Sequence, residues 1–519
     1  MQFDIPIFFG IIHFSSTYTY TDDKDFIRKD TSSFLKTKLK ILTRTKKINQ
    51  KNDMYAILKI EHELCTPTVV VCSVLEYISE IDKTPITSNI LKVMSTCHWT
   101  NTKKMNTSFE KISSIDLTTN REILTNIAVY TIDPQGCLDI DDALHHKSLY
   151  DSNGKLVGHE IGIHIADVSS YIEENSIYDL ELQKRVETLY MDDGIVHMIP
   201  ETLSIEYLSL FANKQRRTFS VILTLNDEYK ITNVSFKKML ITVNENLTYE
   251  DAENKKHTTL SEIYNIGEIL KNNIKDSFKD NEIYDMHQMV AVYMIYANKL
   301  VADKIVSYDA TNVLLRQHGD CNIHDENEYF DSVKNNSENE YFDSVKAKYQ
   351  LSTLNSYHSG LHLQYYTHFT SPIRRYADII VHRQLWKVLC NTKLINNDMD
   401  NIVTYINFCE KYYSLLKRNF NIMRIVDTLQ IEITHANIIN IDIEKCSIRL
   451  LIPKYNIQYE YYISNDKLKS SITIDINNDN VKIINNHTHQ ETIFALYQTI
   501  QIKLVPAKQH MLKLLIEII

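Results

Sequence analysis

Four aspartates crowded between apolar residues constrain the fold of this chain more than any other feature. We call them the aspartate cluster: Asp133, Asp139, Asp141 and Asp142. They fall within ten positions that contain no Lys or Arg, and apolar residues flank them at 127–129 and 143–144. Carboxylates held beside a core repel one another and lose hydration, so they require a compensating cation. A hard divalent ion such as Mg²⁺ binds oxygen ligands of this kind.

The same spacing also fits a solvated turn. Asp is common in turns, and Pro134 and Gly136 inside the stretch favour one. The spacing alone therefore leaves two interpretations open, a polar loop and a metal site. The rest of the chain has to decide between them.

Composition narrows the class of protein. A chain of 519 residues suggests several domains. The net charge of −10 argues against a simple basic coat for nucleic acid, but it allows a local basic channel beside an acidic metal centre. None of the 8 cysteines is spaced as C-x-x-C, so neither a zinc site nor a disulfide framework is expected.

The sequence also predicts where the protein resides. The apolar run at 5–12 has no preceding Lys or Arg, so it predicts a buried strand rather than a signal peptide. No stretch reaches the roughly 18 apolar residues of a membrane helix. We therefore expect a soluble, intracellular protein with no membrane partner, in either the nucleus or the cytoplasm.

Strand patterns dominate both ends of the chain. Before residue 125, β-rich runs lie at 55–60 and 68–75, and a basic segment at 36–51 is either a solvated face or an RNA-tracking edge. Five or six short strand patterns within 431–519 predict a small β-barrel, an OB fold. The predicted fold class is α+β, with a small OB-like barrel at 431–519.

The middle of the chain, residues 126–430, is predicted to be a mixed α/β domain. Strand patterns lie at 127–132, 159–169 and 217–225, and helical patterns lie at 285–306 and 402–429. His164, inside the second of these strands, is expected to be a hydrogen-bonded core residue. Residues 326–334 repeat exactly at 338–346, which predicts an expanded surface loop.

A second motif spans residues 365–378. Ser371 suits a helix N-cap and Pro372 a first helical position, so a helix is predicted from Pro372 to about Leu389. The free N–H groups and positive dipole end at its N-terminus would favour phosphate.

Two arginines follow in the same motif. Arg374 and Arg375 could each hold phosphate oxygens in a bidentate fork. An ion pair within the helix, such as Arg374 with Asp378, is the simpler alternative when this motif is considered alone.

Together, these motifs resemble the ribonuclease II/R family, whose members carry the RNB domain. Residues 133–143 match the family pattern D-P-x-x-x-x-D-x-D-D-A, and residues 369–378 match F-T-S-P-I-R-R-Y-x-D. Further matches follow in family order between the two, so the likeness covers about residues 125–430. Residues 133–137, 141–145 and 451–455 most resemble the catalytic subunit of the eukaryotic exosome. By this resemblance, residues 1–125 are expected to hold one or two reduced cold-shock-like or OB-like β-barrels, without room for that subunit's N-terminal endonuclease domain as well.

The resemblance implies a 3′→5′ exoribonuclease that hydrolyses single-stranded RNA to nucleoside 5′-monophosphates. The aspartate cluster would hold two Mg²⁺ ions during catalysis, and Asp141 matches the aspartate whose loss stops cleavage while binding survives. Tyr190 would hold the 3′-terminal nucleotides, and Arg374, with Arg375 and Ser371, would contact phosphate. The expected partners are single-stranded RNA and an exosome-like or other RNA-processing complex.

Two departures from the family pattern keep other functions open. Val292 stands where the family usually has Glu, and the family's Gly-Ala-Leu hairpin is not recognisable. They motivate an alternative function, a non-catalytic RNA-binding or exosome-like scaffold protein with the same fold. Hydrolysis of DNA or structured RNA is a third hypothesis.

Overall fold

The computed structural model describes residues 116–317 and 347–518, with short gaps, and the backbone of five strands among residues 7–80. Those five strands form one sheet in the order β1-β4-β5-β3-β2. They are β1 (Ile7–Ile12), β2 (Asp25–Ile27), β3 (Lys38–Leu42), β4 (Met54–Ile60) and β5 (Val69–Glu80). The basic segment thus contributes β3, which lies between β5 and β2. The repeated segment at 326–346 lies outside the described residues.

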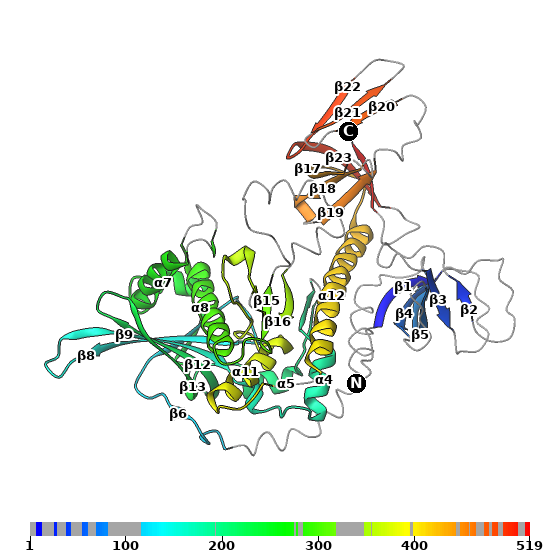
Figure 1. The fold of residues 1–519 in the computed structure, drawn as a ribbon. Helices are drawn as coiled ribbons and strands as arrows, with labels where there is room; N and C mark the ends of the chain where they lie inside the picture. Colours follow the sequence, from blue (N-terminus) through cyan, green and yellow to red (C-terminus); the bar gives the residue numbers. More distant parts are fainter. Residues whose placement is uncertain are drawn as a thin grey trace.

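A seven-stranded sheet forms the central part of the chain, in the order β14-β7-β8-β9-β12-β13-β6 (Figure 1). Its strands are β6 (Glu122–Ile123), β7 (Val129–Asp133), β8 (Asp142–Tyr150), β9 (Leu156–Ala166), β12 (Gln215–Asn226), β13 (Ile231–Thr242) and β14 (Glu245–Thr248). The three predicted strands correspond to β7, β9 and β12. Two short hairpins, β10–β11 (Leu189–Met191, Gly194–Val196) and β15–β16 (Leu314–Gln317, Lys348–Leu351), complete this part.

Helices cover one face of this sheet. They are α4 (Ile177–Arg185), α5 (Glu201–Leu203), α6 (Tyr249–Lys255), α7 (Ser261–Asn273), α8 (Met286–Val306) and α11 (Tyr376–Leu389). In β9, Ile161, Ile163 and Ile165 are fully buried, and they belong to the same core as the apolar side of α8. Val292 is fully buried in that core as well. The position where the family has Glu is therefore a packing position in this chain.

The alternate residues of β9 face the other side of the sheet. His164 Nδ1 lies 2.7 Å from Ser220 Oγ, and its Nε2 lies 2.7 Å from His145 Nδ1. The His145 ring covers Gly162, where a Cβ would come within 2.2 Å of it, so this position has no room for a side chain. The prediction of a hydrogen-bonded core histidine is confirmed.

The predicted start of the helix after Ser371 is wrong. Arg374 and Arg375 donate their N–H groups to the Ser371 carbonyl, so the chain turns at this point, and α11 begins at Tyr376. Arg375 is extended (φ −138°, ψ 126°) and forms a β-bridge with Glu187. Pairing with a segment distant in sequence therefore overrides the local capping signal. Arg374 lies in a turn rather than on a helix N-terminus.

The long helix α12 (Met399–Thr428) follows the prediction and leads to the C-terminal strands (Figure 1). Five of these form a sheet in the order β19-β18-β17-β23-β24, and β20-β21-β22 form another. They are β17 (Glu432–Asp442), β18 (Ser447–Ile452), β19 (Ile457–Tyr462), β20 (Ile472–Ile476), β21 (Asn480–Asn485), β22 (Glu491–Ala495), β23 (Thr499–Pro506) and β24 (Leu514–Ile518). The fold class is therefore confirmed as a mixed α/β centre with β-rich flanks, whereas the domain boundaries stay predictions.

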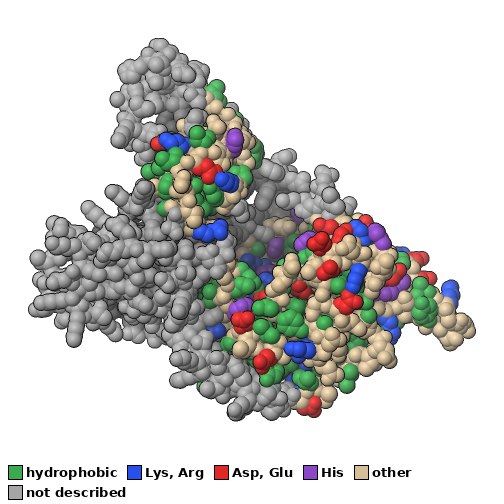
Figure 2. All heavy atoms as spheres, turned by 180° about the vertical axis from the view of Figure 1, so that it is seen from behind, with side chains coloured by type: hydrophobic (Ala, Val, Ile, Leu, Met, Phe, Trp, Pro, Cys, Tyr) green, Lys and Arg blue, Asp and Glu red, His purple; other side chains and the backbone are tan. Residues whose placement is uncertain are grey.

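The surface agrees with the negative net charge. On the face in Figure 2, Lys and Arg side chains of the described residues are interspersed with Asp and Glu, with no continuous basic coat. None of the described helices is long and apolar enough to span a bilayer.

Candidate active site

The aspartate cluster lies at the end of β7, the start of β8 and the loop between them. Asp133 is the last residue of β7, and Asp142 is the first of β8. The loop turns sharply at Gly136, whose φ of +79° favours glycine, and the Cys137 N–H donates to the Pro134 carbonyl at 3.1 Å. The turn that the sequence suggested is therefore present, and it brings the carboxylates together rather than dispersing them in solvent.

A buried serine fixes the second half of this loop. Ser209 Oγ accepts a hydrogen bond from the Ile140 N–H at 2.9 Å and donates one to the Leu138 carbonyl at 2.8 Å. The Leu210 N–H donates to the Ile140 carbonyl at 3.0 Å. Asp139 and Asp141 flank Ile140, so Ser209 positions both of these carboxylates.

We expect Ser209→Ala to loosen the loop. The change leaves the buried Ile140 N–H and the Leu138 carbonyl without this partner, which costs about 1–3 kcal/mol of unfolding free energy. The matched control is Ser204→Ala, because Ser204 is also buried and its Oγ has no hydrogen-bond partner among the described residues. Urea denaturation of both variants measures the difference. Equal unfolding free energies would contradict the positioning role of Ser209.

The carboxylates carry more negative charge than their surroundings neutralise. Burial, with Asp139 nearby, raises the pKa of Asp133 to about 6, and burial, with Asp133 nearby, raises that of Asp142 to about 8. Burial also raises the pKa of Asp141 well above its usual value, although Arg374 opposes the shift. Asp133 Oδ2 and Asp141 Oδ2 are buried and have no hydrogen-bond partner among the described residues. Buried carboxylate oxygens without partners are suitable ligands for a hard divalent cation, so these residues fit a metal site.

The metal-free protein should therefore lose stability as the pH rises from about 4 to 8. The folded state holds protons on Asp133 and Asp142 that the unfolded state has released, so raising the pH favours unfolding. We expect a loss of several kcal/mol, up to about 9, because each unit of pKa shift corresponds to about 1.4 kcal/mol. Urea denaturation in EDTA across this range measures it, and saturating Mg²⁺ should flatten the profile. A flat profile in EDTA would contradict the prediction.

Arg374 is the cation that the structure places beside the cluster. Its Nε lies 3.5 Å from Asp141 Oδ2, and its Nη2 donates to Ser371 Oγ at 2.8 Å. The Arg374 side chain is 41% exposed, whereas that of Asp141 is 3% exposed. Part of the guanidinium therefore faces solvent and is accessible to an incoming anion.

The neighbouring Arg375 lies differently. Its Nη2 contacts Asp378 Oδ1 at 2.8 Å, and the Ser371 N–H donates to the same carboxylate oxygen at 2.7 Å. The simpler alternative was a surface ion pair within the helix, such as Arg374 with Asp378. The structure instead pairs the buried Asp378 with Arg375, which precedes α11. Ser371 itself is buried and contacts Arg374 through its hydroxyl.

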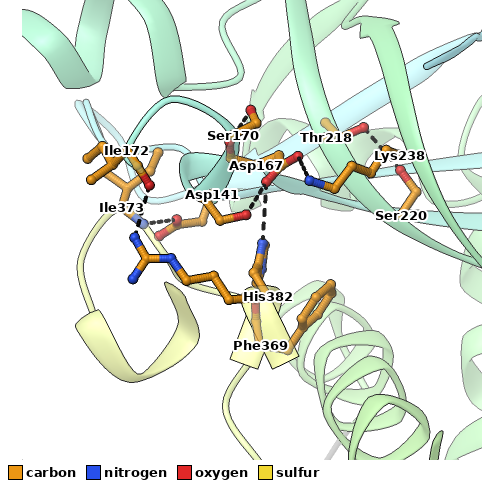
Figure 3. A network of polar contacts seen from close by, with 12 residues as sticks. Asp141, Asp167, Ser170, Ile172, Thr218, Ser220, Lys238, Phe369, Ile373 and His382 are labelled. Atoms are coloured by element: carbon orange, nitrogen blue, oxygen red, sulfur yellow. Dashed lines mark hydrogen bonds and ion pairs between the residues drawn. The ribbon is translucent and has the colours of Figure 1, made fainter. Parts of the chain in front are cut away.

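The loop that carries Arg374 is joined directly to the aspartate cluster. The Ile373 N–H donates to Asp141 Oδ1 at 2.8 Å (Figure 3). Upstream, the Phe369 N–H donates to Asn298 Oδ1 on α8, and the Phe369 carbonyl lies 2.8 Å from His382 Nε2 on α11. The upstream end of the loop is thus fixed by side chains from two helices, and its middle is fixed by Asp141.

A buried aspartate supports His382 from the sheet. Asp167 Oδ1 lies 3.9 Å from His382 Nδ1, and Asp167 Oδ2 lies 3.3 Å from Lys238 Nζ (Figure 3). Asp167 Oδ2 also pairs with Arg121 at 2.5 Å. Although burial opposes the shift, these three groups hold the pKa of Asp167 well below its usual value. Asp167 is therefore a charged anchor beneath the loop rather than a metal ligand.

Aromatic side chains border the carboxylates. The Tyr190 hydroxyl donates a hydrogen bond to Asp139 Oδ2, and the Tyr190 side chain is only half-buried. Burial raises the pKa of Tyr249 to about 12, with Asp142 and Asp133 contributing. Sequence reasoning missed Tyr249, although it directly follows β14, whose Thr248 pairs with Asp133 in parallel. It also missed Cys137, whose Sγ lies 3.6 Å from Asp139 Oδ1.

Comparison with known proteins gives the family. The RNB domain matches residues 121–273 and 255–391, which together make up just over half of the chain. The chain therefore belongs to the RNB domain family. Its relatives include the exosome complex exonuclease RRP44 of Mus musculus, 29% identical over 459 residues, a match that covers 74% of this chain and 47% of the mouse protein. Ribonuclease R of Chlamydia pneumoniae is 28% identical over 52% of this chain and 48% of its own length.

Solved structures share the fold. RNase R of Mycoplasma genitalium, in complex with ribose-methylated single-stranded RNA, aligns with a TM-score of 0.67 at 16% identity, covering 99% of this chain and 89% of that one. Yeast Ssd1, described as a pseudonuclease, aligns with a TM-score of 0.60 at 18% identity over 85% of this chain and 62% of its own. The chain spans about half the length of the curated relatives that it matches.

Proposed function

We propose that this protein is a Mg²⁺-dependent exoribonuclease that hydrolyses single-stranded RNA from the 3′ end to nucleoside 5′-monophosphates. The proposal rests chiefly on one observation. The half-exposed Arg374 lies 3.5 Å from a buried carboxylate oxygen of Asp141 that has no hydrogen-bond partner among the described residues. A phosphodiester placed between Arg374 and the aspartate cluster would meet a cation on one side and ligands for divalent ions on the other.

We assign each residue of the candidate active site a role in this reaction. The aspartate cluster would hold two Mg²⁺ ions, which would supply charge stabilisation and lower the pKa of a water nucleophile. Arg374 contacts the scissile phosphate and stabilises the charge that develops on its oxygens. Ser371 orients Arg374 through the hydrogen bond between its hydroxyl and Nη2 of the arginine.

Tyr190 is the residue proposed to hold the 3′-terminal nucleotides. Its hydroxyl is tied to Asp139, and its half-exposed ring can stack on a base without reading the identity of that base. We assign Arg375 a supporting part in phosphate binding, because its pairing with Asp378 fixes the turn that carries Arg374. An exosome-like or other RNA-processing complex is the proposed larger partner, in line with the relatives.

The test is incubation of the purified protein with single-stranded RNA and Mg²⁺. A label on the 3′ end should appear first as a free mononucleotide, whereas a 5′ label should give progressively shorter products. EDTA should stop both reactions. A DNA oligonucleotide of the same sequence, tested in parallel, decides whether RNA is preferred.

The buried Val292 and the likeness to the pseudonuclease Ssd1 favour a second candidate, a non-catalytic RNA-binding scaffold. That candidate predicts RNA binding that ignores metal and releases no nucleotide. It is less favoured because all four aspartates and Arg374 are present and adjoin one another. Binding without release, unaffected by EDTA, would establish it in place of the exoribonuclease.

A further inference from the structure

Two histidines meet on the helix-covered face of β8 and β9. His146 on β8 is opposite Ile161, and His159 on β9 is opposite Ser148, so the histidines are diagonal neighbours on one side of the hairpin. His146 Nε2 lies 3.0 Å from His159 Nδ1. Two ligands at tetrahedral angles around a zinc ion, with bonds of about 2.0 Å, would be about 3.3 Å apart.

A carboxylate from α7 completes the group. Glu262 is the second residue of that helix, and its ligand atom lies within 4.8 Å of those of His146 and His159. Glu262 Oε2 is buried and has no hydrogen-bond partner among the described residues. We call these three residues the histidine–glutamate cluster.

Contacts within the fold hold both histidine rings in place. His146 Nε2 and His159 Nδ1 face each other at 3.0 Å, and His159 is buried. Its ring stacks on Tyr229, with centroids 4.8 Å apart and planes 16° apart, which fixes its orientation.

The chemical nature of the three ligands indicates which metal ion would bind. Two imidazoles and one carboxylate suit Zn²⁺, which accepts nitrogen and oxygen ligands in a tetrahedron with a water in the fourth position. Mg²⁺ prefers oxygen ligands alone and suits the aspartate cluster instead. The two sites are also separate, because His146 lies four residues beyond Asp142 on β8, which is about 13 Å along a strand.

We propose that the histidine–glutamate cluster of His146, His159 and Glu262 is a second metal site that binds Zn²⁺ or a similar transition-metal ion. The ion links the β8–β9 hairpin to α7. Its role is structural: it joins two strands of the central sheet to a covering helix outside the aspartate cluster. The competing interpretation is a hydrogen-bonded polar cluster that binds no ion.

The test measures Zn²⁺ bound by the full-length protein after dialysis, with saturating Mg²⁺ present to occupy the aspartate cluster. Wild-type protein should retain one equivalent. Glu262→Gln and His146→Gln should each weaken Zn²⁺ binding by more than roughly 100-fold, because even residues that only support a ligand contribute about 10- to 100-fold to affinity. Co²⁺ in place of Zn²⁺ should give the visible absorption of a tetrahedral site, and both variants should lose it.

Two controls separate this site from others. His257→Ala removes an exposed histidine five residues before Glu262, and it should leave binding unchanged. Asp141→Asn alters the aspartate cluster, and it should also retain the Zn²⁺ equivalent. Thermal unfolding without metal checks that Glu262→Gln is folded, and Zn²⁺ should raise the melting temperature of the wild type but not that of Glu262→Gln. No bound Zn²⁺, equal affinity in all variants, or loss of binding only in Asp141→Asn would overturn the proposal.

Discussion

Asp141→Asn is expected to abolish nucleotide release, lowering kcat by about 1000-fold or more, while RNA binding changes only a few-fold. The substitution removes the charge that faces both a metal ion and Arg374, and a single preorganised charge contributes about 100- to 1000-fold to such reactions. RNA contacts elsewhere on the chain would stay intact. Single-turnover cleavage of 3′-labelled RNA measures the rate, and filter binding in EDTA measures the affinity.

The variant should also remain folded, which separates catalysis from stability. The raised pKa of Asp141 means that its charged form destabilises the folded protein, so an uncharged replacement should not lower the melting temperature. The amide oxygen of Asn can still accept the Ile373 N–H. Asp303→Asn is the matched control, because Asp303 lies on α8 and pairs with Lys299 far from the loop in sequence. Wild-type activity in Asp141→Asn would exclude the proposed mechanism.

Arg374→Ala should lower kcat by about 100- to 1000-fold without lowering the free energy of unfolding. The half-exposed guanidinium is proposed to contact phosphate in the transition state, and removing such a contact has an effect of this size. Arg374→Lys should recover only part of the rate, because an ammonium retains the charge but lacks the planar fork of arginine. Steady-state kinetics on a short single-stranded RNA measure both variants.

Arg375→Ala is the variant to compare with Arg374→Ala, because the two arginines have different partners. Arg375 pairs with the fully buried Asp378, so its removal leaves an unpaired buried charge, which costs about 3–5 kcal/mol. We therefore expect a large loss of stability from Arg375→Ala and a large loss of rate from Arg374→Ala. If the two variants behaved alike in both assays, the separate roles assigned to these neighbouring arginines would be wrong.

The strands and long helices of the central part followed from the sequence because their signals are local. Apolar periodicity predicted β7, β9, β12, α8 and α12 to within a few residues. The C-terminal strands were harder, because five or six strand patterns were predicted within 431–519 and the described structure has eight strands there, β17 to β24. In that part of the chain, the polar turns between strands are short, so the apolar pattern does not mark clearly where one strand ends and the next begins.

Contacts between distant segments were outside the reach of these patterns. The bridge between Arg375 and Glu187 delayed the start of α11 and left Arg374 in a turn. Tyr249 reached the aspartate cluster only because β14 pairs with β7. The absence of C-x-x-C spacing led to the expectation of no zinc site, yet His146 and His159 come together through strand register, which no spacing rule anticipates.

The sequence by itself determined which residues have the chemistry: four carboxylates too crowded to stay without a cation, and an arginine motif suited to phosphate. Charge crowding and apolar periodicity are properties of neighbouring residues, so they can be read without a fold. Only the tertiary structure decided which arginine faces Asp141, which serine fixes the acidic loop, and which side chains meet across β8, β9 and α7. Those outcomes depend on strand register and helix packing, which join positions that the sequence keeps far apart.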